Sequence, residues 1–392
     1  MKNRIKELAH RYAPEFVAIR RHIHSHPELS FEEYETSKFL QQKLDEFGVS
    51  YTAGVAGTGI VAIIEGKNPS SKTIALRADM DALPITEAND VPYKSLNKGV
   101  MHACGHDVHT TCVLGATRIL QELKDEFEGT IKVLFQPGEE KHPGGASLMI
   151  QAGALENPRP DAILGMHVQP TMEAGKLGFR AGQYMASADE IYITIKGKGG
   201  HAALPHLTVD TILVASHLVV SLQQVISRNN NPFSPSVLSI CAFNGGYTTN
   251  VIPSEVKLMG TFRAMDETWR FKAHEIIKKQ ATELAHAMGA EIEIEILVGY
   301  PCLYNNEAVT GKARSLAEDF LGLPNVEDTE VRMGAEDFAF YSQIVPACFF
   351  RLGTGNIARG ITSGVHTPTF DVDENAIEVG IGTMAYLATQ FQ

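Results

Sequence analysis

Residues 73–79 read TIALRAD, a short and nearly continuous apolar run that ends on an aspartate. Three similar runs lie in the N-terminal half of the chain: TGIVAIIEG (58–66), IKVLFQP (131–137) and AILGMHV (162–168). Strands that are apolar on both faces are typical of a sheet that helices cover on both sides. We therefore predict an α/β fold built around such a sheet.

Helical patterns accompany these strands. One covers residues 109–127, between the second and third of the four runs. Another covers residues 30–48, where Ser30 and Glu33 have the spacing of a capping box and Gly48 marks the end.

The pattern changes between Asp189 and Val298. The segments there follow the order strand, helix, strand, strand, helix, strand, which is a βαββαβ, ferredoxin-like module. The alternation of helices and strands then resumes up to the C-terminus. We predict a main α/β domain formed by residues 1–183 and 299–392, interrupted by a smaller α+β domain at residues 184–298.

Composition narrows the classes of function. The chain has 392 residues, of which 44% are hydrophobic and 20% charged, and its formal net charge is −12. Nucleic acid is an unfavourable partner, since affinity for a duplex depends on cations that neutralise phosphates. The longest apolar run, ILVASHLVV (212–220), is too short to cross a bilayer, so no membrane partner is expected.

The cysteines and the N-terminus indicate the compartment. Five cysteines are scattered without CxxC spacing, which favours a reducing environment over a disulfide framework. The first ten residues, MKNRIKELAH, lack the apolar segment of a secretory signal. We expect a cytoplasmic protein.

The stretch HACGHDVH, residues 102–109, concentrates three histidines, a cysteine and an aspartate. Read alone, it could also be the start of a helix with a buried thiol and no metal, although this is the less favoured interpretation. However, Asp, Glu and His also follow the predicted strands, and ligands of open α/β sheets gather at the carboxyl ends of strands. These residues are Asp79, Asp81, Glu139, Glu140, His167 and, far downstream, His366.

Donors of mixed type from distant segments indicate a catalytic metal site, because structural zinc sites use locally paired cysteines. Such a site can hold two ions roughly 3.5–4 Å apart. Sulfur together with imidazole favours zinc, with other late transition metals as alternatives.

The pair Glu139–Glu140 in FQPGEE can divide two roles, one carboxylate binding metal and the other acting on water. An isolated pair of glutamates would more often be an acidic surface turn, but this one directly follows an apolar strand.

Other polar residues have two interpretations each. Asp79 and Asp81 could orient a metal-binding histidine or cap the next turn. In the predicted insertion, His201 follows the glycines of KGKGGHAALPH and could be structural, and Asn250 lies in TTNVIP. Arg263 could bind a substrate carboxylate through its two-pronged guanidinium or form a surface salt bridge.

Nine ordered motifs resemble a known family. HPELSFEE, LRADMDALP, HACGHDVHT, FQPGEE, GMHV, GKGGHAALPH, TTNVIP, MGAEDFAFY and HTPTF occur in this order over nearly the whole chain. Together they are similar to the amidohydrolase branch of the co-catalytic metallopeptidases. That branch includes aminoacylase, hippurate hydrolase, auxin–amino acid conjugate hydrolases and N-acetyldiaminopimelate deacetylase.

The resemblance implies a mixed-sheet metallopeptidase catalytic domain with two divalent ions. We expect zinc, with manganese, nickel or cobalt as alternatives. The implied metal ligands are Cys104, His106, Glu140, His167 and His366. Cys104 stands where more distant members have a bridging aspartate, and a thiolate is the softer ligand.

The resemblance also implies the other roles. Glu139 would be the general base that acts on a metal-bridging water, and Asp81 would orient a ligand. The inserted domain would form a dimer interface and lid, so a homodimer or a dimer of dimers is expected. His201 would stabilise the oxyanion, and Asn250 and Arg263 would contact the substrate.

These roles predict hydrolysis of the amide bond of N-acyl amino acids, for example N-acetyl or N-benzoyl derivatives, to a carboxylate and a free amino acid. One alternative is a dipeptidase or aminopeptidase on the same scaffold. Another is a catalytically silent metal-binding or peptide-binding protein, although binding alone needs no second glutamate beside a ligand.

Overall fold

A computed structural model describes residues 1–391 and divides them into two compact units. The main unit comprises Met1–Gly182, Tyr304–Glu330 and Asp337–Gln392, of which the last residue lies outside the description. The inserted unit comprises Gln183–Leu303 and Val331–Glu336.

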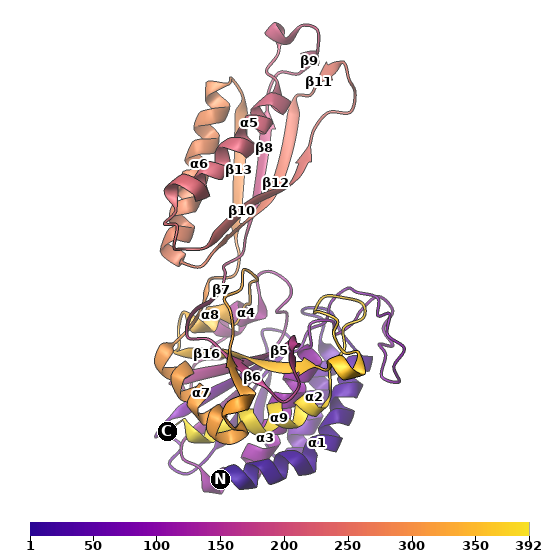
Figure 1. Ribbon diagram of the computed structural model, residues 1–392, viewed down its shortest axis with the longest axis vertical. Helices are drawn as coiled ribbons and strands as arrows, with labels where there is room; N and C mark the ends of the chain where they lie inside the picture. The colour runs from indigo at the N-terminus through magenta and orange to yellow at the C-terminus, as the bar shows by residue number, and fades with distance from the viewer. Residues whose placement is uncertain (392) are drawn as a thin grey trace. The chain divides into compact units, whose positions relative to one another are not determined.

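The main unit is built on an eight-stranded mixed sheet (Figure 1). In spatial order its strands are β1 (Ser50–Val55), β2 (Gly59–Glu65), β4 (Thr130–Gln136), β3 (Thr73–Asp79), β5 (Ala162–Glu173), β16 (Ala347–Gly355), β6 (Leu177–Phe179) and β15 (Val326–Asp328). The four central strands β4, β3, β5 and β16 run parallel, and β1 and β2 are antiparallel additions at one side. The predicted α/β fold with a mixed sheet is confirmed.

Helices cover both faces of this sheet, as the apolar runs predicted. Every residue of β3 and β4 is buried, which requires cover on both sides. Figure 1 shows α4 and α8 on the side of the sheet opposite α1, α3 and α9. The helices are α1 (Lys2–Ser25), α2 (Tyr34–Phe47), α3 (His106–Glu122), α4 (Gly145–Gln151), α7 (Glu307–Leu321), α8 (Ala339–Ser342) and α9 (Asn375–Gln390), with short 3₁₀ turns at Lys124–Glu126, Leu323–Asn325 and Ile357–Arg359.

Helix α3 positions the stretch that the sequence singled out. It begins at His106, three residues before the predicted start, and ends at Glu122. Gly105 precedes it with φ of 85°, in the left-handed region that glycine tolerates. A Cβ at Gly105 would lie 2.5 Å from Cγ2 of Val168, so the glycine lets the start of α3 approach β5 closely.

The predicted capping box at the start of α2 is wrong, although Gly48 ends the helix as expected, with φ of 68°. The Ser30 hydroxyl donates to Asp81 Oδ2 (2.6 Å) instead of capping the helix. The Glu33 carboxylate accepts from the Gly138 amide (2.8 Å) and the Thr58 hydroxyl (2.7 Å). Ser30 and Glu33 therefore bond to residues distant in the sequence and do not form the capping box. These bonds connect the segment before α2 to the loops after β3 and β4.

The inserted unit has the predicted ferredoxin-like order. Its four-stranded antiparallel sheet runs β10 (Ser236–Asn244), β12 (Glu255–Ala264), β8 (Asp189–Lys196) and β13 (Glu291–Val298). Helices α5 (Thr211–Gln224) and α6 (Glu267–Ala287) pack against it, and α5 continues as one π-helical stretch, Val225–Asn229. Smaller elements are β9 (Gly200–His201) paired with β11 (Val251–Ile252), β7 (Gly182–Met185) paired with β14 (Leu303–Asn305), and a 3₁₀ turn at Pro205–Leu207.

None of the helices formed by residues 1–391 combines the length and the apolar character that spanning a bilayer requires.

Candidate metal centre

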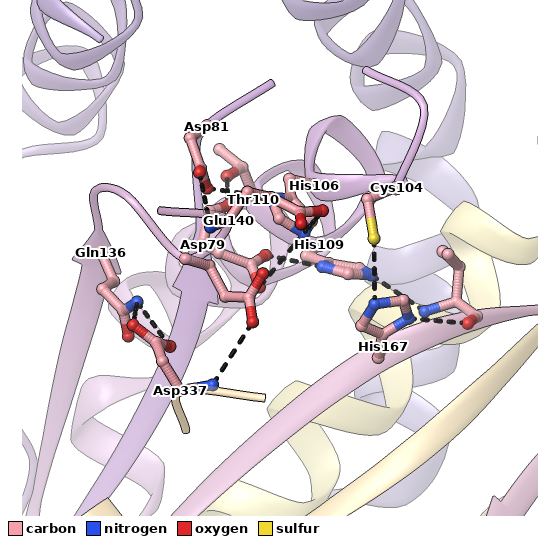
Figure 2. Close-up of polar contacts among 12 residues, drawn as sticks. Asp79, Asp81, Cys104, His106, His109, Thr110, Gln136, Glu140, His167 and Asp337 are labelled. Atoms are coloured by element: carbon pink, nitrogen blue, oxygen red, sulfur yellow. Dashed lines mark hydrogen bonds and ion pairs between the residues drawn. The ribbon is translucent and has the colours of Figure 1, made fainter. Parts of the chain in front are cut away.

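The candidate site forms where several strands of the main sheet end. Asp79 is the last residue of β3, the Glu139–Glu140 pair follows β4, and His167 lies within β5. Cys104 and His106 lie at the start of α3 and face the same point from the helix side (Figure 2). Parallel strands thus bring together residues that are far apart in the sequence.

The five expected metal ligands converge in this place. Cys104 Sγ lies 3.4 Å from His167 Nε2 and 3.3 Å from His366 Nε2. Glu140 Oε1 lies 3.0 Å from His366 Nε2 and 4.0 Å from His106 Nε2. The Cys104 thiol therefore lies between two histidines. His167 is on β5, and His366 contacts Glu140.

These side chains form overlapping groups that could each hold an ion. The donor atoms of Cys104, His106 and His167 lie within 4.8 Å of one another, as do those of Cys104, Glu140 and His366. Both groups contain Cys104, so a shared thiolate could join two ions. A third group combines His106 with Glu139 and Glu140.

Asp81 fixes two of these ligands at once. Its Oδ1 lies 3.1 Å from His106 Nδ1, which leaves Nε2 of that ring directed at the site. Its Oδ2 accepts from the Glu140 backbone amide at 2.9 Å. Carboxylates that hold a histidine in this way are the usual outer partners of metal ligands. The sequence left this role open against turn capping, and the contacts favour orientation.

Asp79 also faces the site, as its two-residue spacing from Asp81 allowed. Its Oδ2 lies 3.7 Å from His106 Nε2 and accepts from Arg77 Nη1 at 2.7 Å. Burial opposes the ionisation of Asp79, but the neighbouring Arg77 and His106 hold its pKa well below the usual range. These neighbours favour the negatively charged form of Asp79 beside the centre.

The charges suit a cation. Burial alone would lower the pKa of His106, but Asp79 and Asp81 outweigh it and raise that pKa to about 10. Burial and the nearby Glu140 raise the pKa of the Cys104 thiol well above its usual value. Burial and Arg351 lower the pKa of His167 well below its usual value. A divalent ion would replace the protons on the first two groups and bind the neutral third directly.

Glu139 is held differently from Glu140. It is buried, with 7% of its surface exposed, and its Oε1 accepts from the Asp337 backbone amide at 3.3 Å. The Asp337 carboxylate is fixed in turn by Arg77 Nη2 (2.6 Å) and the Ala146 amide (2.9 Å). The two adjacent glutamates thus have separate partners. The Glu139 carboxylate is held by the Asp337 amide, and the Glu140 backbone amide is held by the Asp81 carboxylate.

His366 comes to the site on a loop after β16. Its backbone has φ of 62°, an uncommon value for a residue with a side chain, and its amide donates to the Ala103 carbonyl at 2.7 Å. Strained backbone of this kind occurs where the surrounding structure enforces it, often at functional sites. The hydrogen bond ties the His366 loop to the segment that carries Cys104.

The remaining expected residues lie in the inserted unit. His201 is on β9, opposite Val251 of β11, and the Asn250 carbonyl accepts from the Ala202 amide at 3.0 Å, so His201 and Asn250 are neighbours. Both are exposed. Arg263 is near the other end of β12, eight positions beyond Glu255, which is roughly 26 Å along a strand. Arg263 is therefore not part of the His201–Asn250 group within one inserted unit.

Two buried residues at the site were given no role by the sequence. His109 follows His106 by one helical turn and contacts Asp79, and the HACGHDVH spacing was the available signal. Asp337 belongs to MGAEDFAFY, which carried the resemblance without indicating a contact with Glu139.

Comparison with known proteins agrees with this geometry. The family described as peptidase family M20/M25/M40 matches residues 75–390. The chain belongs to this family. The M20 chain is 40% identical to IAA-amino acid hydrolase ILR1-like 4 of Arabidopsis thaliana over 381 residues, covering 96% of this chain and 85% of that protein. It is 41% identical to N-acyl-L-amino acid amidohydrolase of Geobacillus stearothermophilus over 304 residues, covering 78% of this chain and 81% of the relative.

Among solved structures, the M20 chain is similar to the Bacillus subtilis YXEP protein, described as a dinuclear metal binding peptidase of the M20 family. The two share 33% sequence identity with a TM-score of 0.83, over 96% of this chain and 98% of the other. The resemblance inferred from the nine motifs is thereby confirmed.

Proposed function

We propose that this M20 chain is a metal-dependent amidohydrolase that cleaves N-acyl amino acids into a carboxylate and a free amino acid. The observation that carries the proposal is the pair of adjacent glutamates with separate supports. Glu140 faces His366 and His106, while Glu139 is held by the Asp337 amide. A site that only bound metal would have no use for the second buried carboxylate.

The residues present fit a pair of divalent ions. Among residues 1–391, His106 Nε2 is one of the buried polar atoms without a hydrogen-bond partner. Such atoms are costly unless they bind something. Sulfur, imidazole and carboxylate donors together favour zinc, with manganese, cobalt or nickel as alternatives. When bound, the ions polarise the amide carbonyl and make water more acidic.

The side chains of this chain supply the rest of the chemistry. Cys104, His106, Glu140, His167 and His366 would hold the ions, and Asp81 would orient His106. Glu139 removes the proton from the attacking water and delivers it to the departing amine nitrogen, so that the products are a carboxylate and an amino acid.

The inserted unit completes the site in this proposal as a lid. His201 donates to the oxyanion, and Asn250 and Arg263 bind the substrate. Because Arg263 is far along β12 from the other two, the three act together only if a second copy of the chain contributes some of them.

A homodimer through the inserted unit is therefore part of the proposal, with a dimer of dimers as a larger alternative. The surface of the inserted unit supports it: β10 is an edge strand, and α5 exposes Leu213 (50%) and Val220 (73%). Unpaired strand edges and exposed apolar side chains both favour association. We place the protein in the cytoplasm, in keeping with five free cysteines.

The test is amide hydrolysis by metal-stripped enzyme refilled with zinc, manganese, cobalt or nickel. The panel holds N-acetyl, N-benzoyl and longer N-acyl derivatives of several amino acids, with one free dipeptide. We expect metal-restored release of free amino acid from N-acyl substrates. Release from the dipeptide alone would favour the dipeptidase alternative, and no release with metal bound would contradict the substrate class.

A further inference from the structure

Strands β3 and β5 separate at the end that carries the candidate metal ligands. They pair only through Ile74–Arg77 on β3 and Ala162–Gly165 on β5. Beyond this point β3 still pairs with β4 as far as Asp79, while β5 still pairs with β16 beyond His167. The sheet therefore opens between its two central strands, and His167 lies on the strand that has lost one neighbour.

The side chain of His109, on α3, fills this opening. Its Nε2 accepts a hydrogen bond from the Val168 backbone amide at 2.9 Å, and its Nδ1 lies 2.6 Å from Asp79 Oδ1. The Thr110 hydroxyl donates to the Asp79 carbonyl at 2.6 Å and holds the end of β3 from the same helix. The imidazole thus links the two strands where their backbone pairing has stopped (Figure 2).

These two contacts determine where the proton of His109 lies. A backbone N–H can only donate, so Nε2 must be the unprotonated nitrogen, and Nδ1 carries the hydrogen that Asp79 accepts. Both ring nitrogens are therefore occupied within the protein. Although His109 belongs to the same histidine-rich stretch as His106, it has no nitrogen left for a metal ion.

His109 acts on the residue next to its partner. The Val168 amide belongs to the peptide that joins Val168 to His167, and the His109 and His167 rings pack with centroids 4.6 Å apart. His167 Nδ1 lies 2.8 Å from the Val168 carbonyl, which turns its Nε2 toward Cys104. The orientation of the His167 ring thus depends on the backbone of Val168. His109 holds that backbone on the side of β5 where β3 no longer pairs with it.

We propose that Asp79 and His109 are a positioning pair that fixes His167 toward the metal centre by holding the Val168 amide. The proposal rests on the proposed metal site. Asp79 keeps His109 in the required tautomer, and His109 replaces the strand partner that β5 lacks there. Neither residue touches the ion.

Two variants separate this role from simple packing. In His109→Gln, the amide oxygen reaches the position of Nε2 and can still accept from Val168. In His109→Asn, the shorter side chain keeps a donor near Asp79 but cannot reach Val168. A third variant, His274→Asn, is the matched control, because His274 is a buried histidine bonded to Asp189 (2.8 Å) in the inserted unit.

The measurement is cobalt(II) binding to the purified full-length, metal-stripped protein, by chelator competition and by absorption. The spectrum reports both the thiolate–cobalt contact at Cys104 and the geometry around the ion. We expect His109→Asn to weaken cobalt binding by about 10–100-fold and to alter the spectrum, as loss of an outer partner does elsewhere. His109→Gln should remain close to wild type, and His274→Asn should leave both readouts unchanged.

The proposal is overturned if His109→Asn binds cobalt with wild-type affinity and spectrum, or if His109→Gln is as impaired as His109→Asn. Equal impairment of His274→Asn would also overturn it, because the loss would then reflect general destabilisation. Failure of the wild-type protein to bind cobalt would instead contradict the metal site itself.

Discussion

Asp81 and His106 form a buried pair in which the carboxylate directs the ring: Asp81 Oδ1 lies 3.1 Å from His106 Nδ1. The other oxygen of Asp81 accepts from the Glu140 amide and the Ser30 hydroxyl. One side chain outside the proposed metal-binding set therefore contacts two members of that set. Its removal should affect the metal centre as a whole.

Replacement of Asp81 by asparagine should weaken metal binding. An amide has one accepting and one donating end, so either His106 or the Glu140 amide loses its acceptor. We expect metal affinity to fall by about 10–100-fold in chelator competition. Ser30→Ala, which removes only a neutral donor to the same carboxylate, should change affinity far less, and an equal loss in both variants would contradict the orienting role.

Replacement of Glu139 by glutamine should remove proton transfer while leaving the ligands in place. We expect kcat to fall by about 10²–10⁴-fold, the range attributed to a positioned general base. Metal content, measured by elemental analysis, should match the wild type, because Glu139 is not among the expected ligands. An active variant with normal metal content would rule out this base.

Charge introduced on α5 should disrupt the proposed dimer. Val220 is 73% exposed, so Val220→Glu removes no core contact within one chain. Analytical ultracentrifugation should show a shift toward monomer, together with reduced activity if a second copy contributes to each site. Leu323→Glu in the main unit is the matched control, since Leu323 is exposed to a similar extent (68%). A wild-type protein that is monomeric at the outset would contradict the dimer directly.

The inserted unit should lose stability in acid. Asp189 accepts from Arg270 Nε (2.9 Å) and lies 2.8 Å from His274 Nε2. Burial opposes ionisation, but Arg270 and His274 outweigh it and lower the pKa of Asp189. Because the folded pKa lies below the unfolded value of about 3.9, this stabilisation is present above that pH and is lost as pH falls through the folded pKa.

Asp189→Asn tests this directly. The variant should be destabilised at pH 7 by about 3–5 kcal/mol, since Arg270 becomes a buried cation without its main partner. Denaturant unfolding at pH 7 and below pH 4 should show the difference between variant and wild type shrinking in acid. A difference independent of pH would mean that the Asp189 charge is not responsible.

Much of the fold followed from local patterns in the sequence. Runs such as residues 73–79 are nearly continuously apolar, a pattern typical of a sheet covered on both faces, and every residue of that run is buried. The βαββαβ order of the segments between Asp189 and Val298 indicated the insertion. The start of α2 was mispredicted because Ser30 and Glu33 have distant partners, Asp81 and Gly138, that no local rule includes.

The candidate site was less accessible to sequence reasoning. Polar residues after strands indicated where donors would gather, but not which would bind metal and which would support a neighbour. His106 and His109 illustrate the limit, since both are buried histidines on one face of α3. The Val168 amide, 59 positions along the chain, separates their roles because it occupies the second nitrogen of His109.

The two ends of the longer segment of the inserted unit lie close together, where the Ala188 amide donates to the Tyr300 carbonyl at 2.9 Å. Close ends of this kind are what tolerated domain insertions have in common. If the residues between Ala188 and Tyr300 were deleted, a tight turn could join these two residues directly. Recombination can therefore add, exchange or remove this segment as one piece.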